Sequence, residues 1–156
     1  SFDSLIDGII VQNIKFLLES KNYNSYFIKF GNTVYSRNFH KSSNLFDKKT
    51  TNAIKQVGIT IRKLDSYSYL VNSNDKIRTY NINLKTNQIS LNNDFFVIVA
   101  SDSPVNNSIL SNTLNLVDYT IFSENLYEMG IPILIIFKDN GNYIFKHSKS
   151  FEDFLE

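Results

Sequence analysis

Residues 130–146 read Gly-Ile-Pro-Ile-Leu-Ile-Ile-Phe-Lys-Asp-Asn-Gly-Asn-Tyr-Ile-Phe-Lys and contain the sharpest structural signal in this chain. Their apolar part, residues 131–137, is rich in β-branched side chains and is typical of a β-strand. It ends at Asp139-Asn140-Gly141, where Asn-Gly accepts the positive φ angles of a type I′ turn, and residues 142–147 form the expected second strand. Because residues 133–137 are apolar at every position, we expect a helix or a partner to cover both faces of this hairpin's first strand.

Length and composition indicate one globular domain. The chain has 156 residues, of which 42% are hydrophobic and 14% aromatic, with only five Gly and two Pro. A chain of this size can bury its own core, and this composition is that of a folded protein rather than a disordered one. We expect residues 1–156 to be a single domain and a fragment of a longer chain, since the sequence begins at Ser1 without Met.

Charge and cysteine content exclude several classes of function. The 16 basic and 15 acidic residues leave a net charge of +1, so strong autonomous binding to nucleic acid or to a membrane surface is not expected. The absence of Cys excludes disulfides, thiolate nucleophiles and Cys-type metal sites. The longest apolar runs, residues 95–100 and 131–137, are too short to span a bilayer. We therefore expect an intracellular protein, with the nucleus as one option, that does not contact a membrane.

The first 40 residues predict a helix followed by a hairpin. Apolar side chains recur at spacings of three and four in Leu5, Ile6, Ile9, Ile10, Ile14, Leu17 and Leu18. Ser4 with Asp7 resembles a capping box. Two interpretations stay open: one helix from the start, or a short strand through Val11 followed by a helix over residues 12–20. Either helix ends near Lys21-Asn22. Residues 26–30 and 33–39 then pair across a Gly31-Asn32 turn.

The central part predicts a polar loop and then an antiparallel meander. Residues 40–56 are polar and basic and are expected to be a loop, with a helical turn over residues 51–57 left open. Short strands separated by turn residues are predicted in four places: residues 58–64, 67–71, 76–84, and 89–91 leading into 94–100. Such close spacing implies antiparallel pairing.

The last third predicts the same order of elements as the first. After a loop over residues 101–108, residues 112–117 alternate as a short strand, and residues 118–129 form a helix with Asp118 as N-cap and Gly130 after its end. The hairpin follows, and residues 151–156 are either a strand or the first turn of a helix. The predicted fold class is α+β: a mostly antiparallel sheet with two main helices, in which a helix-then-hairpin unit occurs twice.

Side chains suited to catalysis or metal binding are few. His40 and His147 are the only histidines, and two separate strand or loop histidines are a simpler interpretation than a shared metal. Ser148 lies beside His147 and near Asp153, which are the residue types of nucleophilic chemistry. It lacks the glycine-rich flanks of a strained nucleophile turn, so we interpret it as a turn residue.

Three further motifs carry no site. Glu124 and Glu128 lie one helical turn apart, which favours a solvated helix face over a catalytic pair. Leu5-Ile6-Asp7-Gly8 resembles part of a homing-endonuclease helix but lacks the metal-binding acid near its end. Asn106-Asn107-Ser108 is a glycosylation sequon that matters only in a secreted chain. We therefore assign no catalytic, cofactor-binding or metal-binding residue, and we expect no cofactor and no enzymatic activity.

The C-terminal part resembles a domain of the DNA sliding clamps, and of the checkpoint-clamp subunits in particular. The resemblance rests on residues 114–126 as strand and helix, residues 131–137 and 141–145 as strands, and residues 151–155 as an edge strand. It departs from clamps at Asp118, Glu124 and Glu128, where those proteins present basic helices to DNA, so no functional residue carries over. The resemblance implies a non-enzymatic interaction or scaffold subunit of a hetero-oligomer in DNA replication or damage signalling, contacting DNA only indirectly.

The same residues are also similar to the C-terminal part of thioredoxin-like folds. Residues 129–141, a following strand and a helix over residues 150–155 carry this resemblance. It implies a cis peptide bond before Pro132 and, without Cys, a redox-inactive adaptor that binds protein partners.

Overall fold

The core of the protein is a six-stranded antiparallel sheet. The computed structural model describes residues 2–72, 80–83, 88–91, 95–116 and 124–156. The strands lie in the order β1-β2-β3-β6-β7-β8, and every neighbouring pair is antiparallel. Their bounds are Tyr26–Phe30, Thr33–Arg37, Ser66–Asn72, Phe95–Ala100, Ile133–Asp139 and Asn142–His147. A separate two-stranded sheet pairs β4 (Tyr80–Asn83) with β5 (Gln88–Leu91).

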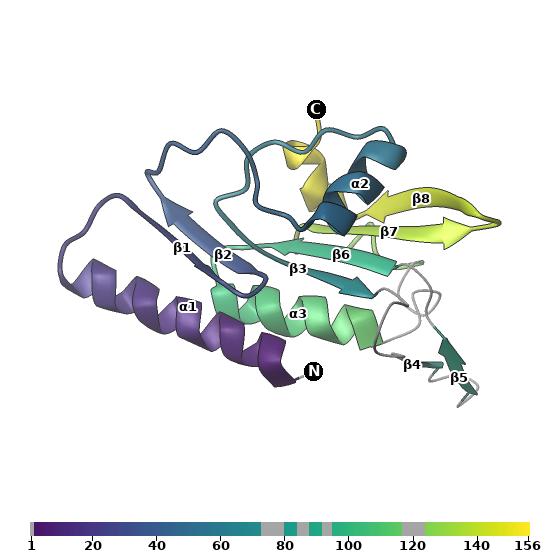
Figure 1. The fold of residues 1–156 in the computed structure, drawn as a ribbon, viewed down its shortest axis with the longest axis horizontal. Helices are drawn as coiled ribbons and strands as arrows, with labels where there is room; N and C mark the ends of the chain where they lie inside the picture. Colours follow the sequence, from purple (N-terminus) through teal and green to yellow (C-terminus); the bar gives the residue numbers. More distant parts are fainter. Residues whose placement is uncertain (1, 73–79, 84–87, 92–94, 117–123) are drawn as a thin grey trace.

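Helices cover both faces of the large sheet (Figure 1). The two long helices, α1 (Phe2–Ser20) and α3 (Pro104–Leu116), lie side by side on one face. The short α2 (Lys48–Gln56) and the 3-10 helix η1 (Lys149–Phe154) lie on the other. The α+β class with a mostly antiparallel sheet is confirmed, and a helix precedes a hairpin twice: α1 before β1–β2, and α3 before β7–β8.

Strand β7 is covered on both faces, as its unbroken apolar run predicts. Side chains of one parity, Leu134 and Ile136, join the cluster under α2 and η1, together with Phe96, Ile98 and Phe151. The β7 side chains of the other parity are Ile133, Ile135 and Phe137. They face α3 in a second cluster with the β6 residues Phe95, Val97 and Val99. Alternate side chains of a strand point to opposite faces, so a run that is apolar throughout requires two covering layers.

Both predicted hairpins are confirmed. Asn140 and Gly141 have φ angles of +50° and +80°, as a type I′ turn requires, and Asp139 pairs with Asn142 across it. In the first hairpin Gly31 has a φ of +54° and Phe30 pairs with Thr33. The second strand of that hairpin ends at Arg37 rather than at Phe39.

The N-terminal segment is one continuous helix, which excludes the strand-then-helix interpretation. The helix ends as predicted, because Asn22 takes a positive φ of +61° and the Tyr23 amide donates to the Leu18 carbonyl at 3.1 Å. Ser4 lies inside the helix and is therefore not its N-cap. On the inner side, Val11 is fully buried against Tyr26 and Ile28 of β1.

The second long helix lies elsewhere than the sequence predicts. Residues 112–116, expected in a strand, belong to α3, which begins at Pro104 inside the expected loop. Residues 124–129, expected in a helix, form turns, and the remainder of that expected helix lies outside the described residues. The alternation was misleading because most of the buried face of α3 consists of small polar side chains, with Leu114 as a buried apolar addition. The buried polar residues are Asn107, Ser108, Ser111 and Asn112.

The region between β2 and β3 also differs from the expectation. The polar loop predicted over residues 40–56 contains α2, whose N-cap Asp47 accepts a hydrogen bond from the Thr50 amide at 2.7 Å. Residues 58–64 do not join the large sheet. Instead the Arg62 amide donates to the Phe154 carbonyl at 2.7 Å, and Ile61 forms an isolated bridge with Leu155. The backbone groups of residues 60–62 therefore pair with the C-terminal segment and not with a strand of the large sheet.

The remaining strand predictions hold in position. Residues 67–71 lie in β3, residues 89–91 in β5 and residues 95–100 in β6, whereas the strand expected over residues 76–84 is described only as β4. The C-terminal segment forms η1 and one bridging residue, Leu155. The peptide bond before Pro132 is trans, contrary to the thioredoxin-like resemblance.

Candidate functional site

A cleft of about 370 Å³ opens where β3 begins and β6 ends. These two strand ends lie together because Tyr67 pairs with Ala100 in the antiparallel ladder. The start of β7 and the end of η1 complete the walls, and the lining residues are Lys63, Leu64, Asp65, Ser66, Ala100, Ser101, Asp102, Pro132 and Phe154. Its volume lies within the roughly 300–1,000 Å³ typical of small-molecule sites.

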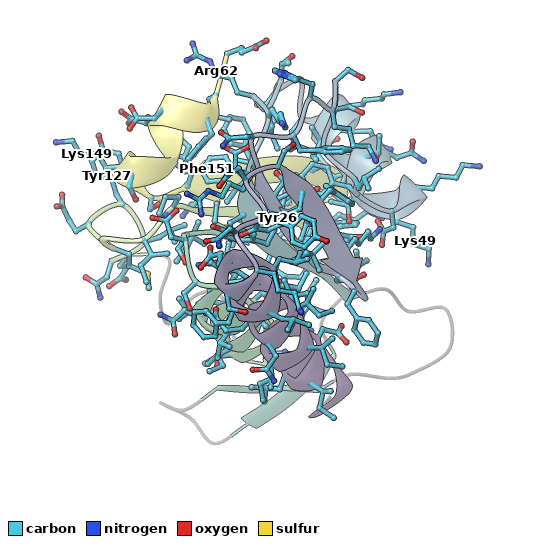
Figure 2. The ribbon with its side chains drawn as sticks, turned by 90° about the vertical axis from the view of Figure 1, so that its left-hand side faces the viewer. Tyr26, Lys49, Arg62, Tyr127, Lys149 and Phe151 are labelled. Carbon is cyan, nitrogen blue, oxygen red and sulfur yellow. The ribbon has the colours of Figure 1, made fainter. Side chains whose placement is uncertain are left out.

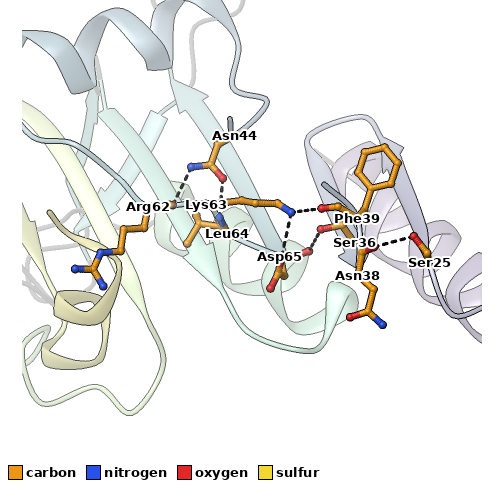
Figure 3. Close-up of polar contacts among 9 residues, drawn as sticks. All are labelled: Ser25, Ser36, Asn38, Phe39, Asn44, Arg62, Lys63, Leu64 and Asp65. Carbon is orange, nitrogen blue, oxygen red and sulfur yellow. Dashed lines mark hydrogen bonds and ion pairs between the residues drawn. The ribbon is translucent and has the colours of Figure 1, made fainter. Parts of the chain in front are cut away.

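Hydrogen bonds fix the segment that forms one side of the cleft (Figure 3). The side chain of Asn44 binds this segment at two points. Its Nδ2 donates to the Arg62 carbonyl at 3.0 Å, and its Oδ1 accepts from the Leu64 backbone amide at 2.7 Å. The Asp65 carbonyl accepts from the Ser36 amide at 2.6 Å, which ties the segment to β2. The backbone that presents Lys63, Leu64 and Asp65 is therefore held from both sides.

Lys63 supplies a cation at the same side of the cleft. Its Nζ donates to the Phe39 carbonyl and lies 3.7 Å from the Asp65 carboxylate. The Lys63 side chain remains one-third exposed and the Asp65 side chain three-quarters exposed, so this ion pair is weak and the ammonium can turn toward a ligand.

A buried asparagine supports the floor of the cleft. The side chain of Asn107, on α3, accepts from Ser101 Oγ at 2.6 Å and donates to the Ser101 carbonyl at 2.9 Å and to Ser66 Oγ at 3.2 Å. Asn107 is fully buried, so it joins the two strand ends through α3 with its polar atoms paired.

Farther from the cleft, buried hydroxyl groups form further hydrogen bonds between α3 and the sheet and between neighbouring strands. Ser111 Oγ donates to Ser68 Oγ at 3.2 Å, and Ser68 Oγ lies 3.2 Å from Thr33 Oγ1. These buried hydroxyls lie on the β2 and β3 side of the sheet, whereas the β6 and β7 side of the same face is apolar. The small polar residues of α3 therefore bind the helix to the sheet, and they hold together the strand ends that form the cleft.

A second hollow of about 420 Å³ lies beside η1, lined by Tyr127, Glu128, Met129, Gly130, Lys149, Ser150, Glu152 and Asp153. Tyr127 and Lys149 lie next to each other at its rim (Figure 2), where the Lys149 amide donates to the Tyr127 carbonyl at 2.8 Å. The Tyr127 hydroxyl donates to Glu152 Oε1 at 3.1 Å, and this bond raises the pKa of Tyr127. Among the described residues, no three His, Cys, Asp or Glu side chains are arranged to hold a metal ion.

The side chains that were considered for metal binding or catalysis do not come together in the structure. His40 follows β2 near one edge of the sheet, and His147 lies on β8 at the other edge, where its ring stacks on Phe145. Ser148 is fully buried: its Oγ donates to the Ile131 carbonyl at 2.8 Å and accepts from the Ile133 amide at 2.9 Å. Ser148 therefore fixes the start of β7.

The glutamate pair and the homing-endonuclease-like motif lie apart from the cleft. Glu124 and Glu128 lie in turns and are exposed, so they do not share a helical face. Within the homing-endonuclease-like motif, Gly8 contacts α3 and the Asp7 carboxylate lies against Gly31 of the β1–β2 turn. Sequence analysis missed the cleft altogether, because its residues come from short polar segments at strand ends, residues 63–66 and 101–102, which carry no motif.

Three solved structures share this architecture over nearly the whole chain. Two are of the flavin transferase ApbE from Vibrio cholerae, one a mutant form, with TM-scores of 0.66 and 0.62 and identities of 15% and 16%. The third is the apo form of the Pseudomonas stutzeri flavinyl transferase ApbE, with a TM-score of 0.59 and 12% identity.

The fold resembles that of the ApbE flavin transferases. The matches cover 97%, 95% and 99% of this chain but 51%, 50% and 51% of the ApbE chains, so this chain spans about half of their length. No protein-family model matches the sequence, and no curated protein matches it. None of the described helices is long and apolar enough to cross a membrane.

The ApbE likeness corrects the functional expectations. The resemblance to sliding clamps was wrong, and so was the thioredoxin-like alternative, because the matching structures belong to neither fold. The expected non-enzymatic scaffold in replication or checkpoint signalling is contradicted too, since the solved proteins with this fold are transferases and therefore enzymes. The generic helix-then-hairpin order misled us, because it occurs in many unrelated α+β folds.

Proposed function

We propose that this chain is the flavin-binding part of a flavin transferase. The observation that carries the proposal is the likeness to ApbE flavin transferases over 95–99% of the chain. At 12–16% identity this likeness concerns the fold, so the activity has to be argued from the site and then tested.

The chemistry of the cleft supports a flavin as its ligand. A flavin combines a planar aromatic ring with a polar edge, and its nucleotide forms add a phosphate. Phe154 offers an aromatic surface, Ser66 and Ser101 line the polar side, and Lys63 offers a cation for a phosphate. The carboxylates of Asp65 and Asp102 are acceptors for ring N–H groups or for hydroxyls of the flavin side chain.

The role of this part of the enzyme is to bind and orient the flavin. Transfer reactions gain much of their rate from holding the reacting groups in place, and the hydrogen-bonded walls of the cleft provide such rigidity. We assign no residue of this chain to the transfer step itself.

Flavin fluorescence provides the test. We expect addition of the purified chain to change the fluorescence of FMN, FAD or riboflavin with a saturable dependence on protein concentration. Lys63→Glu is expected to weaken FMN binding by at least about tenfold, because a charge-assisted hydrogen bond contributes about 1.5–3 kcal/mol. Riboflavin, which has no phosphate, is expected to be affected less.

Lys55→Glu is the matched control. Lys55 is exposed on α2 and does not line the cleft, so the same change of charge there leaves binding unchanged. The proposal fails if none of the three flavins binds at millimolar concentration, or if the two charge reversals have equal effects on FMN.

A further inference from the structure

A segment without regular secondary structure contacts the side of the cleft that carries Lys63. This segment, residues 38–46, connects the end of β2 at Arg37 to Asp47, the N-cap of α2, and is called the strap below. Hydrogen bonds attach both ends of the strap to residues 62–65 or to the sheet, but the two ends are held by different kinds of group. This difference decides which end can respond to a ligand in the cleft.

The end of the strap next to α2 is held by neutral groups. The side chain of Asn44 makes its two hydrogen bonds with backbone atoms of the cleft wall. The Leu45 amide donates to the Tyr67 hydroxyl at 2.7 Å. The Phe46 ring lies 5.3 Å and 5.4 Å from the rings of Tyr67 and Tyr69, which are both buried. None of these contacts uses a charged side chain, so an anion in the cleft leaves this end anchored.

The other end of the strap is held by a charged side chain that also lines the cleft. Lys63 Nζ donates to the Phe39 carbonyl and lies 3.7 Å from the Asp65 carboxylate (Figure 3). The Phe39 side chain is 39% exposed, and its ring contacts Phe27 with the ring centres 5.4 Å apart. One ammonium group therefore serves both the strap and the cleft.

An anionic group in the cleft competes with the Phe39 carbonyl for this ammonium. A hydrogen bond between an ammonium and a phosphate is stronger than one between an ammonium and a neutral carbonyl. The Phe39 carbonyl also accepts from the Lys41 backbone amide at 3.1 Å, so it keeps a partner after Lys63 turns away. The exchange leaves no polar group without a partner, and it favours the anion.

We propose that the strap responds to an anionic ligand in the cleft: when a phosphate takes Lys63, the Phe39 end of the strap is released, whereas the Phe46 end stays anchored. This inference rests on the proposed function, because it takes the phosphate of a flavin nucleotide as the anion. A ligand shifts a conformation only through a contact that differs between the two states, and Lys63 supplies that contact. Riboflavin, which has no phosphate, leaves the strap in place.

A spin label on the strap measures its release. The chain has no Cys, so Ser42→Cys places a single label at an exposed strap position, and Thr113→Cys places one at an exposed position of α3 as the control. Saturation with FMN is expected to raise the ratio of mobile to immobile label at residue 42 about fivefold, the effect of losing one partly exposed hydrogen bond. Riboflavin should leave this ratio unchanged, and the label at residue 113 should respond to neither flavin.

Lys63→Met tests the same hydrogen bond without any ligand. Met has no donor, so in this variant the label at residue 42 should be mobile from the start, and FMN should add nothing further. Lys55→Met on α2 is the matched control and should leave the label unchanged, because Lys55 is exposed and does not line the cleft.

The two proposals fail in different ways. If FMN binds, as its fluorescence reports, and the label at residue 42 keeps its mobility, the strap response is overturned and flavin binding stands. If no flavin binds, the proposed function fails and the response to a flavin nucleotide fails with it. In either case an unchanged spectrum in Lys63→Met shows that this lysine does not hold the strap and overturns the inference.

Discussion

Strand β7 and helix α1 are both strongly apolar, yet the fold treats them in opposite ways. Residues 133–137 of β7 are at most 3% exposed, whereas four large apolar side chains of α1 are about half exposed. The strand lies between β6 and β8 with helices above and below it, whereas α1 lies at the border of one layer. Apolar content shows that a segment needs to be covered, and its place in the fold decides whether this chain provides the cover.

The largest expected effect comes from truncating the covered strand. Ile135→Ala removes part of a fully buried side chain and leaves a cavity, so we expect the free energy of unfolding to fall by about 2–5 kcal/mol. Ile9→Ala on α1 should change the free energy of unfolding, measured by chemical denaturation, by less than about 0.5 kcal/mol. Similar losses at both sites would show that the outer side of α1 is covered within the chain.

The inner side of α1 gives the next largest effect. A Cβ at Gly8 would lie 2.6 Å from Ser108 Cβ and 2.8 Å from the Pro104 carbonyl oxygen, so Gly8→Ala pushes α1 away from α3. Overpacking costs about 1–3 kcal/mol, whereas Ala gains roughly 1 kcal/mol in helix propensity, so we expect a net loss of up to about 2 kcal/mol.

Gly130→Ala is the control for this substitution, because no atom lies within 4 Å of a Cβ built there and its φ is not positive. Chemical denaturation of both variants checks the comparison. If Gly8→Ala stabilised the chain, as propensity alone predicts, the close approach of α1 to α3 would be wrong.

The cover over β7 depends partly on the N-cap of α2. Asp47→Ala removes the acceptor of the Thr50 amide and is expected to lower the free energy of unfolding by about 1 kcal/mol. Asp47→Asn retains an acceptor oxygen and should lose much less. Far-ultraviolet circular dichroism during thermal unfolding measures both, and equal losses would contradict a capping role.

The last prediction concerns how the stability of the folded chain depends on pH through two buried tyrosines. The effect is smallest at neutral pH and becomes clear at high pH. Burial raises the pKa of Tyr67, whose ring packs against Phe46, to about 12, and burial with a hydrogen bond to Glu19 raises the pKa of Tyr26, beside α1, to about 12. Because the folded state prefers the neutral phenol, their contribution to stability is complete below about pH 10 and is lost as the pH rises from 10 to 12.

Absorbance titration of the phenolate checks this expectation. Tyr67→Phe and Tyr26→Phe should each remove one late-titrating group from the curve. Ionisation of either tyrosine near pH 10 would show that its phenol is not shielded from water in the folded chain.

Local signals were sufficient for some elements and not for others. Asn140-Gly141, Gly31 and the apolar run of residues 133–137 each predict their structure from neighbours in the sequence, and each is confirmed. The position of α3 was not predictable in this way, because its buried face is made of Asn107, Ser108 and Ser111. Such side chains identify a buried face only once their partners Ser66, Ser68 and Ser101 are known.

The sequence by itself determined the α+β class, the two hairpins and the need for cover on both faces of β7, since φ preferences and side-chain alternation act over a few residues. Only the tertiary structure decided that residues 63–66 meet residues 101–102 at a cleft, and that the apolar side of α1 faces outward. Both outcomes depend on contacts between segments far apart in the chain, whose free energy depends on geometry that no local pattern records.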